Sequence, residues 1–242
     1  MVSPPGPDSG TGRAAGHRHT TTATQHDVPW HKFDDVLPEW FEGYLGLEAE
    51  ATKISTYESD LVPGLLQTER YAAALLAAFP LRTTPDEMER AVELRRARQT
   101  RLSGYNPVTL DAAISETVLR RVIGGPQVMQ AQLESLINAV REPNITLRLL
   151  PFTAAEHPGL DGAFSVLEFP DPADGRTVCV EALTSTLHIE GTRQVGLYRL
   201  AFDQIQEAAL EPDETTKVIA TRVKELEICV RTAQSGARSG PT

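Results

Sequence analysis

The feature that most constrains this chain is a run of four short β-type segments between residues 143 and 190. The segments 145–150, 164–169, 177–183 and 186–190 are rich in Val, Ile, Leu, Phe and Thr, and turns containing Pro, Gly and Asp separate them. Successive strands that are joined by short turns pair antiparallel. This stretch therefore predicts a small, mainly antiparallel sheet.

The last two segments predict a hairpin with one polar face. Because side chains alternate between the faces of a strand, Cys179 and Glu181 share one face, as do His188 and Glu190 on the next strand. If residues 184 and 185 form a two-residue turn, Glu181 lies opposite His188, and Cys179 lies opposite Glu190. We therefore expect two carboxylates, a thiol and an imidazole on one face of this hairpin.

Amphipathic repeats predict helices around the sheet. Apolar residues spaced by three and four, together with capping residues, predict helices at 34–54, 68–78, 85–102, 126–140, 195–209 and 213–230, and a further strand at 108–114. The predicted fold class is α+β, with a helical N-terminal half, a small mainly antiparallel sheet and C-terminal helices packed over it. We expect one ligand-binding-like domain at 30–231, a disordered tail at 1–29 and a frayed tail at 232–242.

Composition argues against several classes of function. The net charge of −10 does not suit a nucleic-acid surface, which needs clustered Lys and Arg. No apolar run approaches the roughly 20 residues of a membrane helix, and the N-terminus lacks the apolar stretch of a signal peptide, so we expect a cytoplasmic protein. Neither a glycine-rich phosphate loop nor an H-x-x-x-H or H-E-x-x-H pattern is present, so we expect no cofactor and no metal.

The basic residues of the chain cluster in one predicted helix. Five arginines lie between residues 85 and 102, at positions 90, 95, 96, 98 and 101, and four acidic residues share this helix at pairing distances. We interpret the helix as a salt-bridged, exposed face.

Four residues are candidates for catalysis. Glu181 and His188 could form a carboxylate–imidazole pair, in which the carboxylate orients the ring and raises its basicity; the alternative is a polar cross-strand pair on an exposed sheet face. His157 lies in a loop after a strand, where functional groups concentrate, and the alternative is a surface loop residue. Glu116 could be an acid at a pocket mouth, or it could pair with an arginine of the following turn, Arg120 or Arg121.

Residues around the apolar run 61–66 could line a ligand cavity, and the alternative is ordinary core packing. Cys179 as a nucleophile would need a nearby base and a lowered pKa. The complete set of candidate ligand-binding residues is Tyr57, Leu61, Leu65, Gln67, Tyr71, Phe164, Cys179 and Tyr198.

Several blocks resemble one domain family in order and spacing. They are YESDLVPGLLQTERYA, VELRRARQ, ETVLRRVIGGPQVMQAQLESL, NITLRLLPF, GAFSVLEFPD, VCVEAL and FDQIQEAALEPDET. Together they resemble the C-terminal domain of unknown function of actinobacterial XRE-family helix-turn-helix regulators, which are often described as antitoxin-like. The likeness covers roughly residues 40–227 and implies a role in sensing or in protein interaction.

The chain also departs from that family. No helix-turn-helix pattern can be placed before the sequence blocks that resemble the family, so we expect the domain to act without a DNA-binding domain of its own. The family usually has Asp where Ser115 stands, an aromatic residue at Cys179 and a large residue such as Tyr at His188. The last two positions lie on the hairpin face described above.

These observations leave two functional hypotheses. In the first, the chain is a cofactor-independent catalyst that uses a regulator-derived pocket to cyclise or rearrange an apolar, polyketide-like natural product. In the second, it is a stand-alone small-molecule sensor or antitoxin-like interaction module. The expected partners are an apolar small molecule and a protein partner or second copy of the chain, with no direct contact to nucleic acid or membrane.

Overall fold

A single mixed sheet forms the centre of the computed structural model, which describes residues 30–78 and 84–238. Its strands are β1 (Lys53–Glu58), β2 (Thr109–Ser115), β3 (Ile145–Leu150), β4 (Phe164–Glu168), β5 (Arg176–Ala182) and β6 (Ser185–Ile189), in the spatial order β3-β2-β1-β4-β5-β6. The strands β1, β2 and β3 run parallel, while the pairs β1–β4, β4–β5 and β5–β6 are antiparallel. The predicted tail at 1–29 lies outside the described residues.

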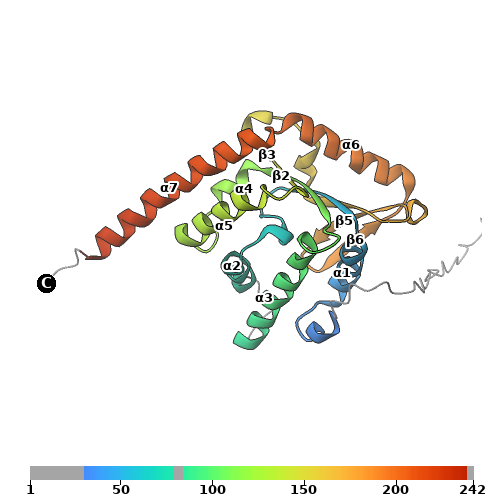
Figure 1. The fold of residues 1–242 in the computed structure, drawn as a ribbon, viewed down its shortest axis with the longest axis horizontal. Helices are drawn as coiled ribbons and strands as arrows, with labels where there is room; N and C mark the ends of the chain where they lie inside the picture. The colour runs from blue at the N-terminus through green and yellow to red at the C-terminus, as the bar shows by residue number, and fades with distance from the viewer. Residues whose placement is uncertain (1–29, 79–83, 239–242) are drawn as a thin grey trace, which may run out of the picture.

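Helices cover both faces of this sheet, which confirms the predicted α+β class (Figure 1). They are α1 (Glu39–Glu50), α2 (Glu69–Ala78), α3 (Pro85–Gln99), α4 (Glu116–Arg120), α5 (Pro126–Ala139), α6 (Thr192–Ala208) and α7 (Pro212–Arg238). The pairs α2–α3 and α4–α5 connect the parallel strands, because a parallel pair needs a long crossover. The helix α6 lies on the opposite face of the sheet from α1, α3 and α5.

The helix predicted at 34–54 ends earlier than its apolar repeat indicated. The helix α1 stops at Glu50, Ala51 is extended with φ −62° and ψ 138°, and Ile54 belongs to β1. Ala51 and Ile54 continue the apolar spacing of the helix because both are buried, although Ala51 follows the helix and Ile54 belongs to the strand. The sheet therefore includes two strands from the N-terminal half of the chain.

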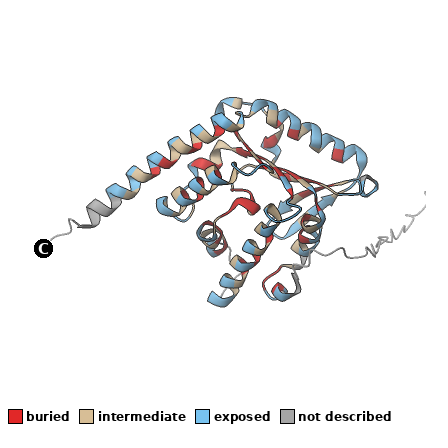
Figure 2. Cartoon of the chain, viewed as in Figure 1, coloured by how far each residue is buried: buried red, intermediate tan, exposed pale blue. Residues whose placement is uncertain are grey.

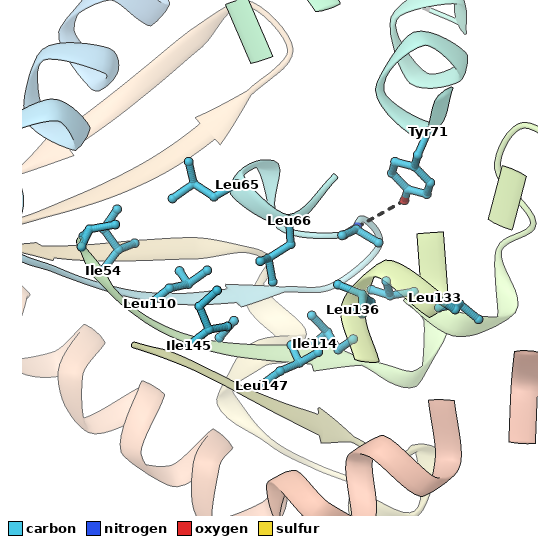
Figure 3. Close-up of a cluster of buried hydrophobic side chains, with 14 of the residues drawn as sticks. Ile54, Leu65, Leu66, Tyr71, Leu110, Ile114, Leu133, Leu136, Ile145 and Leu147 are labelled. Carbon is cyan, nitrogen blue, oxygen red and sulfur yellow. Dashed lines mark hydrogen bonds between the residues drawn. The ribbon is translucent and has the colours of Figure 1, made fainter. Parts of the chain in front are cut away.

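Most of the apolar core lies between the sheet and the helices α2, α3, α5 and α7. Residues from β1, β2 and β3 meet residues from α5 and the 64–66 turn in this layer, and Figure 3 labels Ile54, Leu65, Leu66, Tyr71, Leu110, Ile114, Leu133, Leu136, Ile145 and Leu147. The Tyr71 hydroxyl is buried there and accepts a hydrogen bond from the Val62 N–H at 3.2 Å. A buried hydroxyl without such a bond would destabilise the fold.

A second cluster of buried residues lies under α6. Tyr57, Phe164 and Val178 on the sheet pack against Phe202 and Ile205 on the helix. The sheet is consequently buried on both faces over most of its area (Figure 2).

The last helix, α7, continues to Arg238 and extends past the domain boundary predicted at Arg231. It packs on α5 through Ile219, Val223 and Leu226, all buried. Figure 1 shows the remainder pointing away from the sheet. Among the described residues, no helix has the length and apolar character that crossing a membrane requires.

The β5–β6 hairpin has a different register from the predicted one. Ala182 pairs with Ser185, so the turn residues are Leu183 and Thr184, one position earlier than expected. Cys179 consequently lies opposite His188, and Glu181 lies opposite Thr186. The prediction that Glu181 and His188 face each other directly is wrong, although both side chains are on the expected face.

Candidate functional site

A cavity of about 490 Å³ lies between the sheet and the helices α1 and α3. Its floor consists of β1, β4 and β5, and the segment 59–67 closes one side. Leu37, Pro38, Trp40, Phe41, Leu61, Val62, Leu75, Leu94 and Leu183 supply much of its apolar wall. Cavities of this size and mixed lining are typical of small-molecule sites.

Strand alternation decides which side chains form the floor. Ile54, Thr56 and Glu58 of β1 share one face, and the register places Ser165 of β4 next to Thr56, and Cys179 next to Ser165. The hydroxyl oxygens of Thr56 and Ser165 are 2.9 Å apart and form a hydrogen bond. The floor is therefore apolar at one end and carries carboxyl groups at the other.

One wall contains a buried ion pair between α3 and α1. Arg98 donates two hydrogen bonds of 2.8 Å to the two oxygens of Glu48, and the side chains are only 5% and 1% exposed. The Arg98 guanidinium also lies 5.1 Å from the ring centre of Phe41 and 5.5 Å from that of Tyr44. Removal of one partner from such a pair costs about 3–5 kcal/mol, so it fixes α3 against α1.

The arginine-rich helix does not form the self-contained exposed face that the sequence predicted. Arg98 is buried, and Arg90 pairs with Asp35 at 2.8 Å. Arg96 pairs with Glu69 at 2.9 Å. Each of these acidic partners comes from outside α3, so tertiary contacts replaced the predicted pairing along the helix.

Three further hydrogen bonds hold the segment 59–67 at the cavity wall. Arg95 donates to the Gln67 side-chain oxygen at 2.8 Å, and Gln67 in turn donates to the Val62 carbonyl at 2.7 Å. Asp60 accepts from Arg121 at 2.7 Å. The bonds of Gln67 satisfy a buried polar side chain, whereas the Arg121–Asp60 pair lies at the surface.

Two carboxyl groups, Glu58 and Glu181, lie at the polar end of the cavity. Burial, followed by the nearby charge of Glu181, raises the pKa of Glu58 from 4.5 to about 8. Burial also raises the pKa of Glu181, while Arg98 and Arg95 oppose that rise. Glu181 is exposed to solvent by accessible surface, but its side chain lines the cavity. The surrounding protein therefore raises its pKa even though solvent can reach it.

Several of the residues predicted to bind ligand line this cavity. Leu61, Leu65, Gln67, Phe164 and Cys179 are among its lining residues, as is the predicted catalytic carboxylate Glu181. The Phe164 ring itself packs beneath α6, with its centre 5.1 Å from that of Tyr198. Burial raises the pKa of the Cys179 thiol to about 12, the opposite of what a nucleophile requires.

The other predicted ligand-binding residues do not line the cavity. Tyr57 lies in the apolar cluster between the sheet and α6, and Tyr198 lies on α6 itself and packs against that cluster. Tyr71 is part of the core beside the cavity, where its hydroxyl holds the backbone of Val62.

Three of the four predicted catalytic residues also lie outside the cavity. Glu116 pairs with Arg120 at 2.8 Å and accepts from the Phe152 N–H at 3.1 Å, which lowers its pKa and gives it the predicted turn-fixing role. His157 lies against Tyr57, with ring centres 6.2 Å apart. His188 is exposed and lies next to Gly43 of α1.

The sequence reasoning missed the most unusual group of the site, Glu58. Its signal was the alternation within KISTYE, where Ile54, Thr56 and Glu58 occupy every second position. It also missed Glu48, since nothing local distinguishes a glutamate that meets an arginine 50 residues away.

Fold and cavity together define a class: an α+β domain with a half-enclosed, largely apolar chamber that carries carboxyl groups at one end. The family described as Domain of unknown function (DUF5753) matches residues 41–221, and the chain belongs to it. This family accompanies regulators of the XRE type. None of the curated proteins and none of the solved structures compared with the chain matches it.

Proposed function

We propose that the protein binds an apolar small molecule in this cavity and serves as the sensor module of a regulatory system. The observation that carries the proposal is the chamber of about 490 Å³, which combines an apolar wall with polar and charged side chains. The family's association with regulators supports the regulatory part. The proposal retains the expectations of an actinobacterial source, of no DNA reader within the chain, and of a protein partner or second copy that receives the signal.

A binding experiment tests the proposal. The probe is 1-naphthalenemethanol, a neutral aromatic alcohol small enough for the chamber, with binding measured by calorimetry and by the midpoint of thermal unfolding. A ligand at 100 times its Kd stabilises a protein by about 2.7 kcal/mol, which corresponds to a rise of about 5–10 °C for a domain of this size.

Two matched variants locate the binding. Ala91 of α3 is buried and lines the cavity, so Ala91→Met fills part of the chamber and weakens binding. Ala208 is exposed on α6, across the sheet, so Ala208→Met leaves binding unchanged. Equal affinity of both variants, or no binding by the wild type, contradicts the proposal.

A second candidate function is cofactor-free catalysis of a cyclisation or rearrangement of an apolar, polyketide-like compound. The pKa of about 8 at Glu58 favours it, since this carboxyl keeps its proton at neutral pH beside an apolar wall and can act as a general acid. A catalyst converts the bound compound into an isomer of equal mass and different retention, and Glu58→Gln abolishes that conversion while binding persists. Recovery of the bound compound unchanged, after long incubation, excludes catalysis of that compound.

A further inference from the structure

Some of the carboxyl groups that line the cavity form ion pairs with arginines, and others do not. Arg98 holds Glu48, and Arg121 holds Asp60, each at hydrogen-bond distance. Glu58 and Glu181, by contrast, have no ion pair or side-chain hydrogen bond within residues 30–78 and 84–238. Two carboxyl groups thus face the chamber without a direct partner in the described protein.

The Glu58 carboxyl group, which has no cationic partner in direct contact within the described part of the chain, holds a proton at neutral pH because its pKa is about 8. The groups that act on this carboxyl come from every neighbouring element, and they are Glu181 on β5, Arg95 and Arg98 on α3, Asp60 after β1 and Tyr71 on α2. The two arginines lower its pKa, but burial and the carboxylates outweigh them and leave it at about 8. An external cation at this place would remove the need for that proton.

We infer that the ligand is an apolar molecule with a basic nitrogen, whose ammonium group lies at Glu58 and Glu181 while its apolar body contacts Trp40 and Leu61. This inference rests on the proposed binding function and specifies its ligand class. Charge-assisted hydrogen bonds to carboxylates stabilise an ammonium group, and the apolar wall that includes Trp40 and Leu61 accommodates the rest of the molecule.

An anionic ligand fits the same chamber poorly. Arg98 is engaged by Glu48, and Arg95 donates to Gln67. A ligand carboxylate at this end of the cavity would add a negative charge beside Glu58 and Glu181, which would raise their pKa values further and could not replace the proton on Glu58. A neutral ligand would leave the protonation of Glu58 and Glu181 unchanged and would gain no binding free energy from an ion pair with them.

Three probes with one aromatic body and different head groups test the inference. They are 1-naphthylmethylamine, 1-naphthalenemethanol and 1-naphthoic acid, compared by calorimetry at neutral pH. We expect the amine to bind about tenfold or more tightly than the alcohol, and the acid to bind most weakly.

Carboxyl variants assign the preference to the two groups. Glu58→Gln and Glu181→Gln each reduce the preference for the amine over the alcohol, and affinity for the alcohol persists. The control is Glu42→Gln, which removes an exposed carboxylate from α1 outside the chamber and leaves the preference intact.

The pH dependence supplies an independent readout. The amine is protonated at both pH 6 and pH 7, so each ammonium group that binds displaces one proton from Glu58 into solution. Its affinity for the wild type then rises about tenfold per pH unit in this range, whereas the affinity of the alcohol does not change. In Glu58→Gln the slope disappears.

Other outcomes overturn the inference in distinguishable ways. If the alcohol binds as tightly as the amine, or the acid binds most tightly, the charge assignment fails while the proposed binding function stands. If none of the three probes binds, both fail. An amine preference that survives in Glu58→Gln and Glu181→Gln also overturns the assignment, because the nitrogen then lies elsewhere.

Discussion

At Glu58, a carboxyl group at the end of a strand couples protonation to folding. Its pKa is raised from 4.5 in an open chain to about 8 in the folded protein. Between these two values, the native state binds a proton that the unfolded state has lost, so the free energy of unfolding decreases as the pH rises. The stabilisation by this proton is complete below about pH 4.5 and is lost by the time the pH has passed about 8.

The variant Glu58→Gln should therefore flatten the dependence of stability on pH. One proton contributes a slope of at most about 1.4 kcal/mol per pH unit, and the variant removes much of it, becoming more stable than the wild type as the pH approaches 8. Urea unfolding at several pH values measures this. Glu89→Gln on α3, an exposed carboxylate, should follow the wild-type curve. A Glu58→Gln curve parallel to that of the wild type would refute the assigned pKa.

The local sequence pattern could not predict ion pairs between residues that are far apart in the chain. Arg98 sits in a helix that is polar nearly all round, so its periodicity marks no buried face. Its partner Glu48 is 50 residues away, and only the packing of α3 on α1 brings the two together. The pair of Glu116 with Arg120 was predictable, because both lie within one turn of the same helix.

At the scale of elements, α1 approaches the edge strand β6 through a glycine. A Cβ atom on Gly43 would lie 2.8 Å from the His188 ring carbon Cε1, closer than real contacts allow. A Cβ atom on Gly46, one turn further along the same helix, would meet nothing within 4 Å. Gly43 thus lets the imidazole rest against the helix backbone.

Alanine substitutions at these two glycines should have different effects. Gly46→Ala should stabilise the protein by about 0.5–1 kcal/mol, since alanine loses less backbone entropy in a helix. Gly43→Ala should give a smaller gain or a loss, because the His188 ring must move. In a His188→Ala background the two substitutions should become equivalent, as chemical denaturation of the four variants would show. If both substitutions raise the free energy of unfolding equally in the wild-type background, the contact between residue 43 and the His188 ring does not affect stability.

The elements that the sequence predicted best are those with strong local signals. The helix α3 begins at Pro85 as predicted, with a capping box of Thr84 and Glu87, and β2, β3, β4 and β5 lie within a residue or so of their expected positions. The strand β1 was missed because Ala51 and Ile54 extend the helical spacing of α1. The β5–β6 register was off by one because Leu183-Thr184 carries none of the residues that mark a two-residue turn.

At the scale of the whole molecule, one sheet is shared by two apolar cores. Leu133 of α5 is fully buried on one face, and Phe202 of α6 is 4% exposed on the other. Since β1, β2 and β4 contribute to both cores, neither core can lose its packing without disturbing the strands that support the other. We therefore expect cooperative unfolding.

Large-to-small substitutions on either face should lower the same single transition. Leu133→Ala should cost about 2–5 kcal/mol and Phe202→Ala about 3–5 kcal/mol, and circular dichroism and tryptophan fluorescence should report coincident curves. Leu200→Ala, on an exposed part of α6, should change little. Two separated transitions in either core variant would indicate that the layers unfold independently.

The central place of β1 also has a consequence during protein synthesis. Its antiparallel partner β4 follows about a hundred residues later in the chain, as the contact between Thr56 and Phe164 illustrates with a separation of 108 residues. At a translation rate of about 5–20 residues per second, one edge of β1 waits roughly 5–20 s for its neighbour. An unpaired strand edge is a site for wrong pairing, so the same topology that builds the chamber exposes the nascent chain to aggregation until β4 emerges.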